Sequence, residues 1–124
     1  MFIPMTHYIA KPATTEMTAG LTDYGSYTDV GYTASMGSLT STALGPFTIL
    51  ELYTQNTGGG PYLFMRLVGN QVALFNSYTT LSVGAVDYTI SEAASVTWNF
   101  VNTYIQFNGA THLTDATTYT ILLV

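Results

Sequence analysis

Two histidines, His7 and His112, are the candidate general bases of this sequence. A Ser-His-Asp triad needs an imidazole within hydrogen-bond reach of a nucleophile and an acid that orients the imidazole. His112 and Asp115 are close in sequence and serine is frequent, so spacing alone leaves a triad open. The Gly-x-Ser-x-Gly turn of one large class of hydrolases is absent. We therefore interpret His112 as a surface-loop histidine and predict a protein without catalytic residues.

The carboxylates allow a second kind of chemistry. Glu51 and Glu92 are candidates for the paired acids of a glycosidase, which lie about 5 to 9 Å apart. Seven acidic residues in 124 make some pair in space expected by chance. We instead interpret Glu51, together with Arg66, as a charge that protects a strand edge from pairing. Glu92 is interpreted as an acid in a capped turn.

Metal and phosphate sites have weak support in the sequence. Asp23 and Asp29 bracket a glycine-containing loop that offers oxygen ligands for calcium, but the alternating acids of an EF-hand loop are missing. Gly58-Gly59-Gly60 is followed by neither Lys-Ser nor Lys-Thr, so it is not a phosphate-binding loop. Cysteine is absent, which excludes thiolate metal sites. We expect no cofactor and no metal, and interpret both loops as strand connections.

Charge is scarce and negative. Charged residues make up 7% of the chain, and Lys11 and Arg66 face seven acids for a net charge of −5. Two cations exclude a protein that follows nucleic-acid phosphates and a polybasic membrane anchor. The N-terminus has no basic segment before an apolar one, and no apolar run reaches 18 residues. We expect synthesis in a cytoplasm, no membrane segment and no nucleic-acid partner.

The elements that must position these residues are predicted to be strands, because threonine, tyrosine and alternating apolar residues dominate and no helical periodicity is sustained. We predict an all-β fold, a single antiparallel β-sandwich or jelly-roll-like domain, with under about 10% helix. The predicted strands are 47–53, 62–68, 71–78, 86–90, 96–107 and 119–124.

Three local features refine this pattern. Gly69-Asn70 is a strong two-residue hairpin signal between the second and third predicted strands. Strand 96–107 changes phase, so we expect a bulge or bend near Phe100 and Val101, with Trp98 in the core. Residues 91–94 predict a short capped turn, and Asn108-Gly109 ends the long strand.

The amino-acid composition of the chain changes near residue 45. Residues 11–45 contain few aliphatic side chains, so we predict an extended N-terminal arm and loops with one or two short strands over 1–45, and a β-sandwich core over 46–124. Such an arm cannot repay its own ordering entropy but can order against a neighbour. We predict that Tyr24, Tyr27 and Tyr32 of this arm contact other chains, because interfaces are enriched in tyrosine.

The threonine-, glycine- and tyrosine-rich segment from Lys11 to Gly45, followed by charge-poor strands, resembles small β-rich structural proteins of tailed-bacteriophage virions. The resemblance implies a non-enzymatic capsid decoration or tail-associated subunit. It also implies a homo-oligomer, often a trimer, that contacts other virion proteins and resides in the virion.

A second resemblance concerns Pro46-Phe47-Thr48-Ile49, Trp98 and the segment 104–109, which look like parts of concanavalin-type jelly-roll domains. One extra residue separates Tyr104 from Asn108-Gly109 compared with that pattern, so no functional residue is carried over. This resemblance implies a carbohydrate-binding protein, within a virion or outside it, with a glycan as its ligand.

Overall fold

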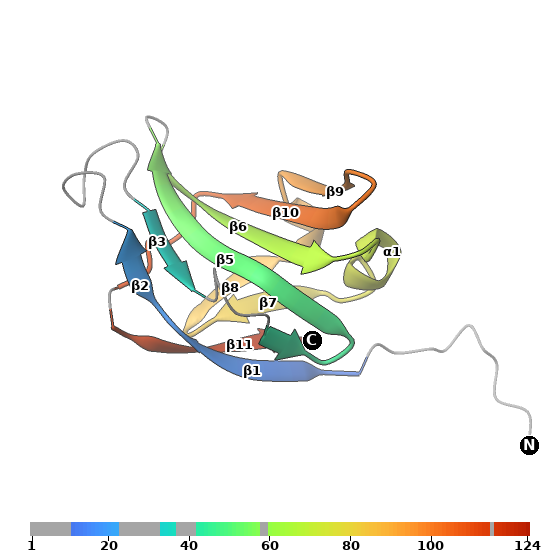
Figure 1. The fold of residues 1–124 in the computed structure, drawn as a ribbon, viewed down its shortest axis with the longest axis horizontal. Helices are drawn as coiled ribbons and strands as arrows, with labels where there is room; N and C mark the ends of the chain where they lie inside the picture. The colour runs from blue at the N-terminus through green and yellow to red at the C-terminus, as the bar shows by residue number, and fades with distance from the viewer. Residues whose placement is uncertain (1–10, 23–32, 37–41, 58–59, 115) are drawn as a thin grey trace, which may run out of the picture.

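Alternating apolar residues bury one side of most strands, and two antiparallel sheets pack these sides together (Figure 1). The computed structural model describes residues 11–22, 33–36, 42–57, 60–114 and 116–124. The small sheet has the order β1-β11-β7-β8. Its strands are β1 (Ala13–Thr18), β11 (Thr118–Leu123), β7 (Thr80–Val83) and β8 (Val86–Thr89). The predicted all-β sandwich is therefore confirmed.

The large sheet has the order β2-β3-β5-β6-β10-β9, and β4 pairs with β5 beside this path. Its strands are β2 (Gly20–Thr22), β3 (Thr33–Met36), β4 (Thr42–Leu44), β5 (Phe47–Thr57), β6 (Gly60–Val68), β9 (Ser95–Trp98) and β10 (Asn102–Asn108). All pairings in both sheets are antiparallel. The long strands β5, β6 and β10 lie next to one another, so they form a broad sheet face.

Helical structure is limited to short pieces in the described part of the chain. The helix α1 (Val72–Phe75) follows β6, and the 3-10 turn η2 (Ile90–Glu92) follows β8. Among the described residues, no helix is long and apolar enough to span a bilayer. Ser91 and Glu92 of the predicted turn 91–94 belong to η2, which has no side-chain cap. The predicted strand 71–78 is wrong, because α1 forms within it.

The core lies between the sheets and is built from the inward side chains of both. Its largest fully buried members are Phe47, Phe75, Leu44, Ile49, Leu52, Leu63, Met65, Leu67, Leu81, Ile105 and Leu113. The ring centroids of Phe47 and Phe75 lie 6.1 Å apart, and those of Phe47 and Tyr78 lie 5.9 Å apart. These rings connect β5 to the segment that crosses from the large sheet to the small one.

Four predicted strands are confirmed, with small differences at their ends. They correspond to β5, β6, β8 and β11, and β10 ends at Asn108 as expected. Gly109 then adopts a φ of 66°, the left-handed conformation that glycine reaches at little cost. Alternation and turn residues identified these strands because both are local signals.

The region before residue 46 differs from the predicted arm. Its described residues form four strands, β1 to β4, and β1 pairs with β11 over six positions. Ala13, Met17 and Leu44 are buried in the common core. The prediction of one or two strands is therefore wrong for the described residues. A strand buries alternate residues, so β1 needed few aliphatic side chains to join the sheet.

The β4–β5 turn shows how closely this region packs. Leu44 and Phe47 are paired, so Gly45 and Pro46 form a two-residue turn, and Gly45 has a φ of 55°. A Cβ at position 45 would lie 2.6 Å from the Cβ of Ala13. Glycine here satisfies both the backbone conformation and the close approach of β1.

The predicted hairpin at Gly69-Asn70 is wrong. After β6 the chain forms α1 and crosses to β7, while β6 pairs with β5 and β10. The buried Thr103 of β10 holds this exit in place. Its hydroxyl accepts the Gln71 N–H at 2.7 Å and donates to the Gly69 carbonyl at 2.7 Å. A long-range side chain therefore overrides the local hairpin signal.

The predicted long strand 96–107 is two strands. β9 and β10 form a hairpin in which Trp98 pairs with Thr103, so the phase change marks a chain reversal and not a bulge. Trp98 is 41% exposed, which contradicts its predicted core position. β9 is the last strand of the large sheet, so the small sheet does not cover this side chain completely.

Candidate functional site

His112 is buried, not on a surface loop as predicted. Its Nδ1 lies 2.7 Å from the Oγ1 of Thr54, and that oxygen also accepts the Leu113 N–H at 3.0 Å. The Thr54 hydroxyl donates to Nδ1 or accepts from it according to which imidazole nitrogen carries the proton. Desolvation by burial lowers the pKa of His112 below its ordinary value of 6.5. The imidazole is therefore neutral near pH 7.

This hydroxyl–imidazole pair has the composition of a nucleophile and its base, but its place in the fold opposes catalysis. Thr54 has no exposed surface, so a substrate cannot reach its oxygen. Asp115, the acid predicted nearby, and His7 lie outside the described residues. The geometry therefore supports a structural link between β5 and the loop that follows β10.

The two glutamates considered as an acid pair are on different layers. Glu51 lies on the outer face of the large sheet, where its Oε2 is 3.4 Å from an Arg66 Nη2 on β6. Glu92 belongs to η2, which follows β8 of the small sheet, and it is exposed. Glu51 therefore faces a cation and not a second carboxylate. The predicted edge-protecting role of Glu51 and Arg66 is also wrong, because β5 and β6 are interior strands.

The remaining predicted sites lie mostly outside the described residues. Asp23 and Asp29, proposed around a calcium-type loop, and the predicted interface residues Tyr24, Tyr27 and Tyr32 are all in this category. Within the described residues, no group of three or more histidine, cysteine, aspartate or glutamate side chains is arranged to hold a metal ion.

Aromatic side chains gather on the outer face of the large sheet. We call this set the aromatic face: Tyr53 on β5, Tyr62 and Phe64 on β6, and Tyr104 on β10. The ring centroids are 4.9 Å apart for Tyr53 and Phe64, which stack. They are 6.3 Å apart for Tyr53 and Tyr62, and 5.6 Å apart for Phe64 and Tyr104. All four side chains are half-buried, so the rings form one continuous surface.

Strand alternation and one irregularity build this face. Tyr53 pairs with Phe64, and Tyr104 pairs with Arg66, so these side chains share one side of the sheet. The β5–β6 register shifts between Ile49 and Glu51. The shift lets Ile49 and Leu52 both point inward, which turns Glu51 and Tyr53 outward.

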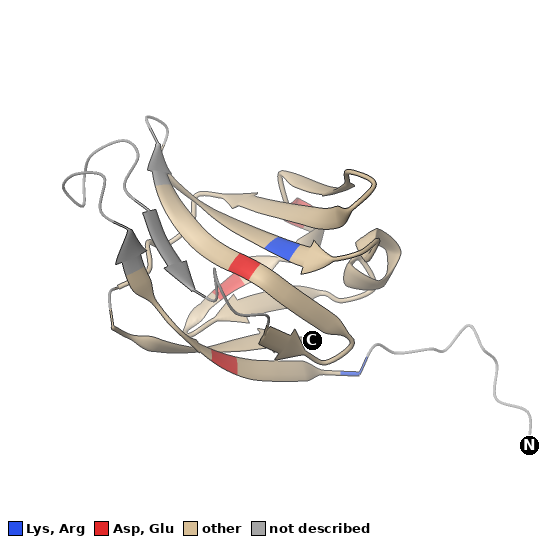
Figure 2. Ribbon diagram, in the orientation of Figure 1, with Lys and Arg blue, Asp and Glu red and all other residues tan. Residues whose placement is uncertain are grey.

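Polar groups surround the rings. The Tyr62 hydroxyl donates to the Oε1 of Gln55, and Gln106 on β10 pairs with Phe64. The Glu51–Arg66 ion pair lies beside them, as the adjacent red and blue positions of Figure 2 show. Burial, and then proximity to Tyr62 and Glu51, raises the pKa of Tyr53 well above its ordinary value. Its hydroxyl is therefore a neutral hydrogen-bond group.

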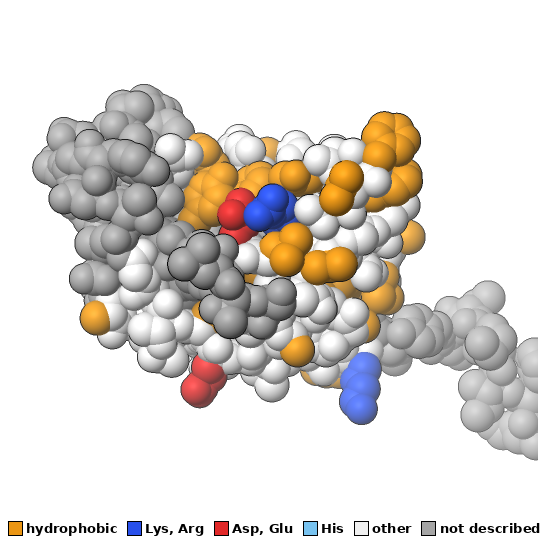
Figure 3. All heavy atoms as spheres, viewed as in Figure 1, with side chains coloured by type: hydrophobic (Ala, Val, Ile, Leu, Met, Phe, Trp, Pro, Cys, Tyr) orange, Lys and Arg blue, Asp and Glu red, His pale blue; other side chains and the backbone are white. Residues whose placement is uncertain are grey.

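In the space-filling view, apolar side chains border the red and blue pair on this side of the molecule (Figure 3). The sequence carried a signal for the face. Tyr53 alternates with Leu52 and Thr54 in the first strand. After the turn that follows this strand, Tyr62 and Phe64 alternate with Leu63 in the next one. Pairing the two strands places the three rings on one side of the sheet.

The outer face of the small sheet has a different composition, and we call it the hydroxyl face. It presents Thr14, Glu16, Thr18, Thr80, Ser82, Asp87, Thr89, Thr118, Thr120 and Leu122. Thr18 and Thr118 hydroxyls lie 2.8 Å apart, and the Ser82 hydroxyl donates to Asp87 Oδ1 at 2.6 Å. This surface offers short polar groups and no aromatic ring.

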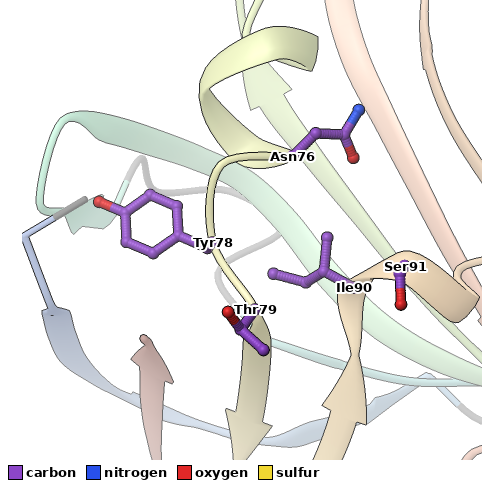
Figure 4. A pocket seen from close by; sticks show the side chains of 5 residues that line it. All are labelled: Asn76, Tyr78, Thr79, Ile90 and Ser91. Atoms are coloured by element: carbon purple, nitrogen blue, oxygen red, sulfur yellow. The ribbon is translucent and has the colours of Figure 1, made fainter. Parts of the chain in front are cut away.

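A hollow of about 360 Å³ lies where α1, β7 and η2 approach one another. Figure 4 shows its lining residues, in which Ile90 points toward Thr79 and Tyr78 while the Asn76 amide points away from them. Its lining is completed by Ser91. These five residues supply amide and hydroxyl groups but no carboxylate, imidazole or amine. The hollow therefore lacks an acid–base pair of its own.

The described surface thus offers an aromatic face with an ion pair, a hydroxyl face and small hollows, and its hydroxyl–imidazole pair is sealed in the core. The aromatic face is the candidate functional site, because it combines large half-exposed rings with amide groups and a guanidinium. No protein-family model, no curated protein and no solved structure matches this chain.

Proposed function

We propose that this protein is a non-enzymatic structural subunit that associates, through the aromatic face, with copies of itself and with neighbouring proteins. The observation that carries the proposal is the set of four half-exposed rings on adjacent strands, two of them stacked at 4.9 Å. Tyrosine and arginine are enriched at protein interfaces, while most other charged residues are depleted there.

The shape and energetics of this face support association. Three neighbouring strands present a broad surface, and a standard interface covers about 800 Å² on each partner. Aromatic pairs contribute roughly 0.5–1.5 kcal/mol beyond the area that they bury. The Nε of Arg66 is buried and has no hydrogen-bond partner among the described residues.

The resemblance to tailed-phage proteins suggests the setting. We propose a capsid decoration or auxiliary subunit that stabilises a virion through contacts between subunits, with a trimer as the expected homo-oligomer. A charge content of 7% agrees with surfaces that meet other proteins.

A second candidate function is carbohydrate binding. The amides of Gln55 and Gln106 lie beside the rings, and a sugar site combines aromatic rings with convergent polar groups. We rank it second because the rings pack against each other in T-shaped, stacked and tilted pairs, which covers part of the ring faces that would stack on a sugar.

Matched lysine substitutions on the two outer faces test the proposal. Phe64→Lys and Tyr104→Lys each place a charge in the aromatic face, and Thr120→Lys places one at an interior strand of the hydroxyl face. We expect the first two variants to weaken self-association at least about tenfold in sedimentation-velocity experiments, because a buried charge would oppose the interface. Thr120→Lys should associate like the unchanged protein.

Circular dichroism and thermal melting of each variant establish that the fold is retained. A protein that stays monomeric at all concentrations and binds glycans through a face that Phe64→Lys inactivates would overturn the assembly proposal in favour of the second candidate. Equal association of all three variants would overturn the role of the aromatic face.

A further inference from the structure

The turn between β9 and β10 projects apolar side chains into solvent. We call Trp98, Phe100 and Val101 the apolar tip; they are 41%, 83% and 67% exposed. The Trp98 and Phe100 ring centroids lie 5.0 Å apart. Phe100 has a φ of 74°, a conformation that bulky residues rarely adopt. A strained aromatic residue exposed to solvent lowers the stability of the isolated chain. A partner surface that covers the tip would therefore be favourable.

The turn is built so that it can leave water at low cost. The Asn99 N–H donates to the Asn102 carbonyl at 3.2 Å. The Asn99 side-chain oxygen accepts the N–H groups of Val101 at 3.2 Å and Asn102 at 3.0 Å. Three N–H groups of the turn are thus bonded within it. Burying hydrogen-bonded backbone costs far less than burying unpaired groups.

A hollow of matching chemistry lies where β1 begins beside the β4–β5 turn. It has a volume of about 400 Å³ and is lined by Lys11, Pro12, Gly45, Pro46 and Tyr78. The Tyr78 hydroxyl donates to the Lys11 carbonyl at 2.8 Å, which fixes one wall. Two proline rings and a tyrosine provide apolar surface, and an ammonium group can lie over an aromatic face. We call this hollow the proline pocket.

We propose that the apolar tip of one copy of this chain inserts into the proline pocket of a second copy. Phe100 is largely exposed, so the tip does not fill the pocket of its own chain. Each copy has one tip and one pocket, and a closed symmetric oligomer satisfies all of them. The inference rests on the proposed function as an assembly subunit but uses a separate surface from the aromatic face.

Charge favours a protein partner over a lipid surface. The net charge is −5, and of the two cations Arg66 already faces Glu51 while Lys11 belongs to the proline pocket. The tip residues carry no cation that could contact anionic lipid headgroups, and they carry no negative charge that a second copy would repel. Because the same chain carries both the apolar tip and the proline pocket, two copies can contact each other through these two features.

Phe100→Asn tests the tip in the full chain. Asparagine tolerates a positive φ, so the variant removes the ring and relieves the backbone. We expect self-association to weaken at least tenfold in sedimentation velocity, with no loss of thermal stability under dilute conditions. Thr89→Asn, on the exposed edge strand β8, is the matched control and should associate like the unchanged protein.

Cross-linking tests the contact itself, because the chain has no cysteine. Val101→Cys and Pro12→Cys proteins are mixed and oxidised, and a disulfide between the two kinds of chain is expected. Val101→Cys mixed with Thr89→Cys should give no such product. Disulfides formed only between two Val101→Cys chains would show tip-to-tip contact and overturn the proposal.

Two further outcomes would also overturn it. One is a Phe100→Asn variant that associates normally while Phe64→Lys dissociates; the proposed function would then survive without the tip contact. The other is binding of the unchanged protein to phosphatidylcholine vesicles that Phe100→Asn abolishes, which would assign the tip to lipid. Loss of association in Phe100→Asn alone, with Phe64→Lys unaffected, would support the tip and reject the aromatic face.

Discussion

The two outer faces of the sandwich have the same backbone geometry and opposite chemistry. The hydroxyl face presents mainly threonine and serine, whereas the aromatic face presents four rings and an ion pair. Threonine favours strands and is satisfied by water, so the hydroxyl face needs no partner. A low charge content therefore does not by itself mark an interface. The rings, and not the missing charges, distinguish the face that we propose to be covered.

The largest effect is expected from changing threonine to valine on the inside and on the outside of the sandwich. Thr54→Val removes the hydroxyl that serves both His112 and the Leu113 N–H, which leaves buried polar groups without it. We expect a loss of about 2–3 kcal/mol in the free energy of unfolding. Thr120→Val on the hydroxyl face should stay within about 0.5 kcal/mol. Urea denaturation measures both values, and equal effects would contradict the assigned roles.

The pH dependence of the free energy of unfolding should reflect the burial of His112. Because burial lowers the pKa of His112 below 6.5, the folded state binds its proton less readily than the unfolded state. Stability is therefore fully present above pH 6.5 and declines as the pH falls below it toward the folded-state pKa. Thermal melting between pH 7.5 and 5 measures the decline. A His112→Gln variant should show a weaker decline over this interval, and an unchanged slope would assign the effect to other groups.

Tyr53 of the aromatic face should ionise at a higher pH than a tyrosine in water. The pKa of Tyr53 is raised above 10.0 by burial and by Tyr62 and Glu51, so its contribution to stability is present below pH 10 and is lost as the pH rises further. Ultraviolet titration of the tyrosinate band should show a late component that Tyr53→Phe removes. A titration curve that is the same in both proteins would show that the Tyr53 hydroxyl is more open to water than described.

The smallest effect is expected from the ion pair on the aromatic face. Glu51 and Arg66 side chains are 26% and 32% exposed, and such pairs contribute at most about 1 kcal/mol. Glu51→Gln should lower the free energy of unfolding slightly at low salt and less in 1 M salt, because salt screens partly exposed charges. Chemical denaturation at two salt concentrations tests this, and a loss above 2 kcal/mol would show that the pair is effectively buried.

The sequence predicted those parts of the fold that depend on local order. Alternation located β5, β6, β8 and β11, and Asn108-Gly109 located the end of β10, because each signal acts within a few residues. The hairpin predicted at Gly69-Asn70 is wrong because Thr103, over thirty residues away, hydrogen-bonds the segment that leads from β6 to α1. The predicted core position of Trp98 is wrong because strand alternation gives only the side of the sheet that a residue faces. The place of Trp98 on the last strand of the sheet is a tertiary property.

The candidate site was predictable only in part. The alternation of Tyr53 and of Phe64 is local, but their contact depends on the register between β5 and β6 and on the shift near Glu51. His112 appeared as a surface residue because its partner Thr54 comes from a distant strand. Tyr24, Tyr27 and Tyr32 stay a prediction, since they lie outside the described residues.

The position of β11 in the small sheet has a consequence for the chain during its synthesis. β11 lies between β1 and β7, so each of these two strands lacks this shared partner until β11 has been made. The β5–β6 hairpin, in contrast, is complete much earlier on the ribosome. A nascent chain therefore carries β1 with an open edge through most of its translation, and unpaired strand edges promote aggregation. The threonines and Glu16 of β1 are polar, so this strand can remain exposed to water until β11 is made.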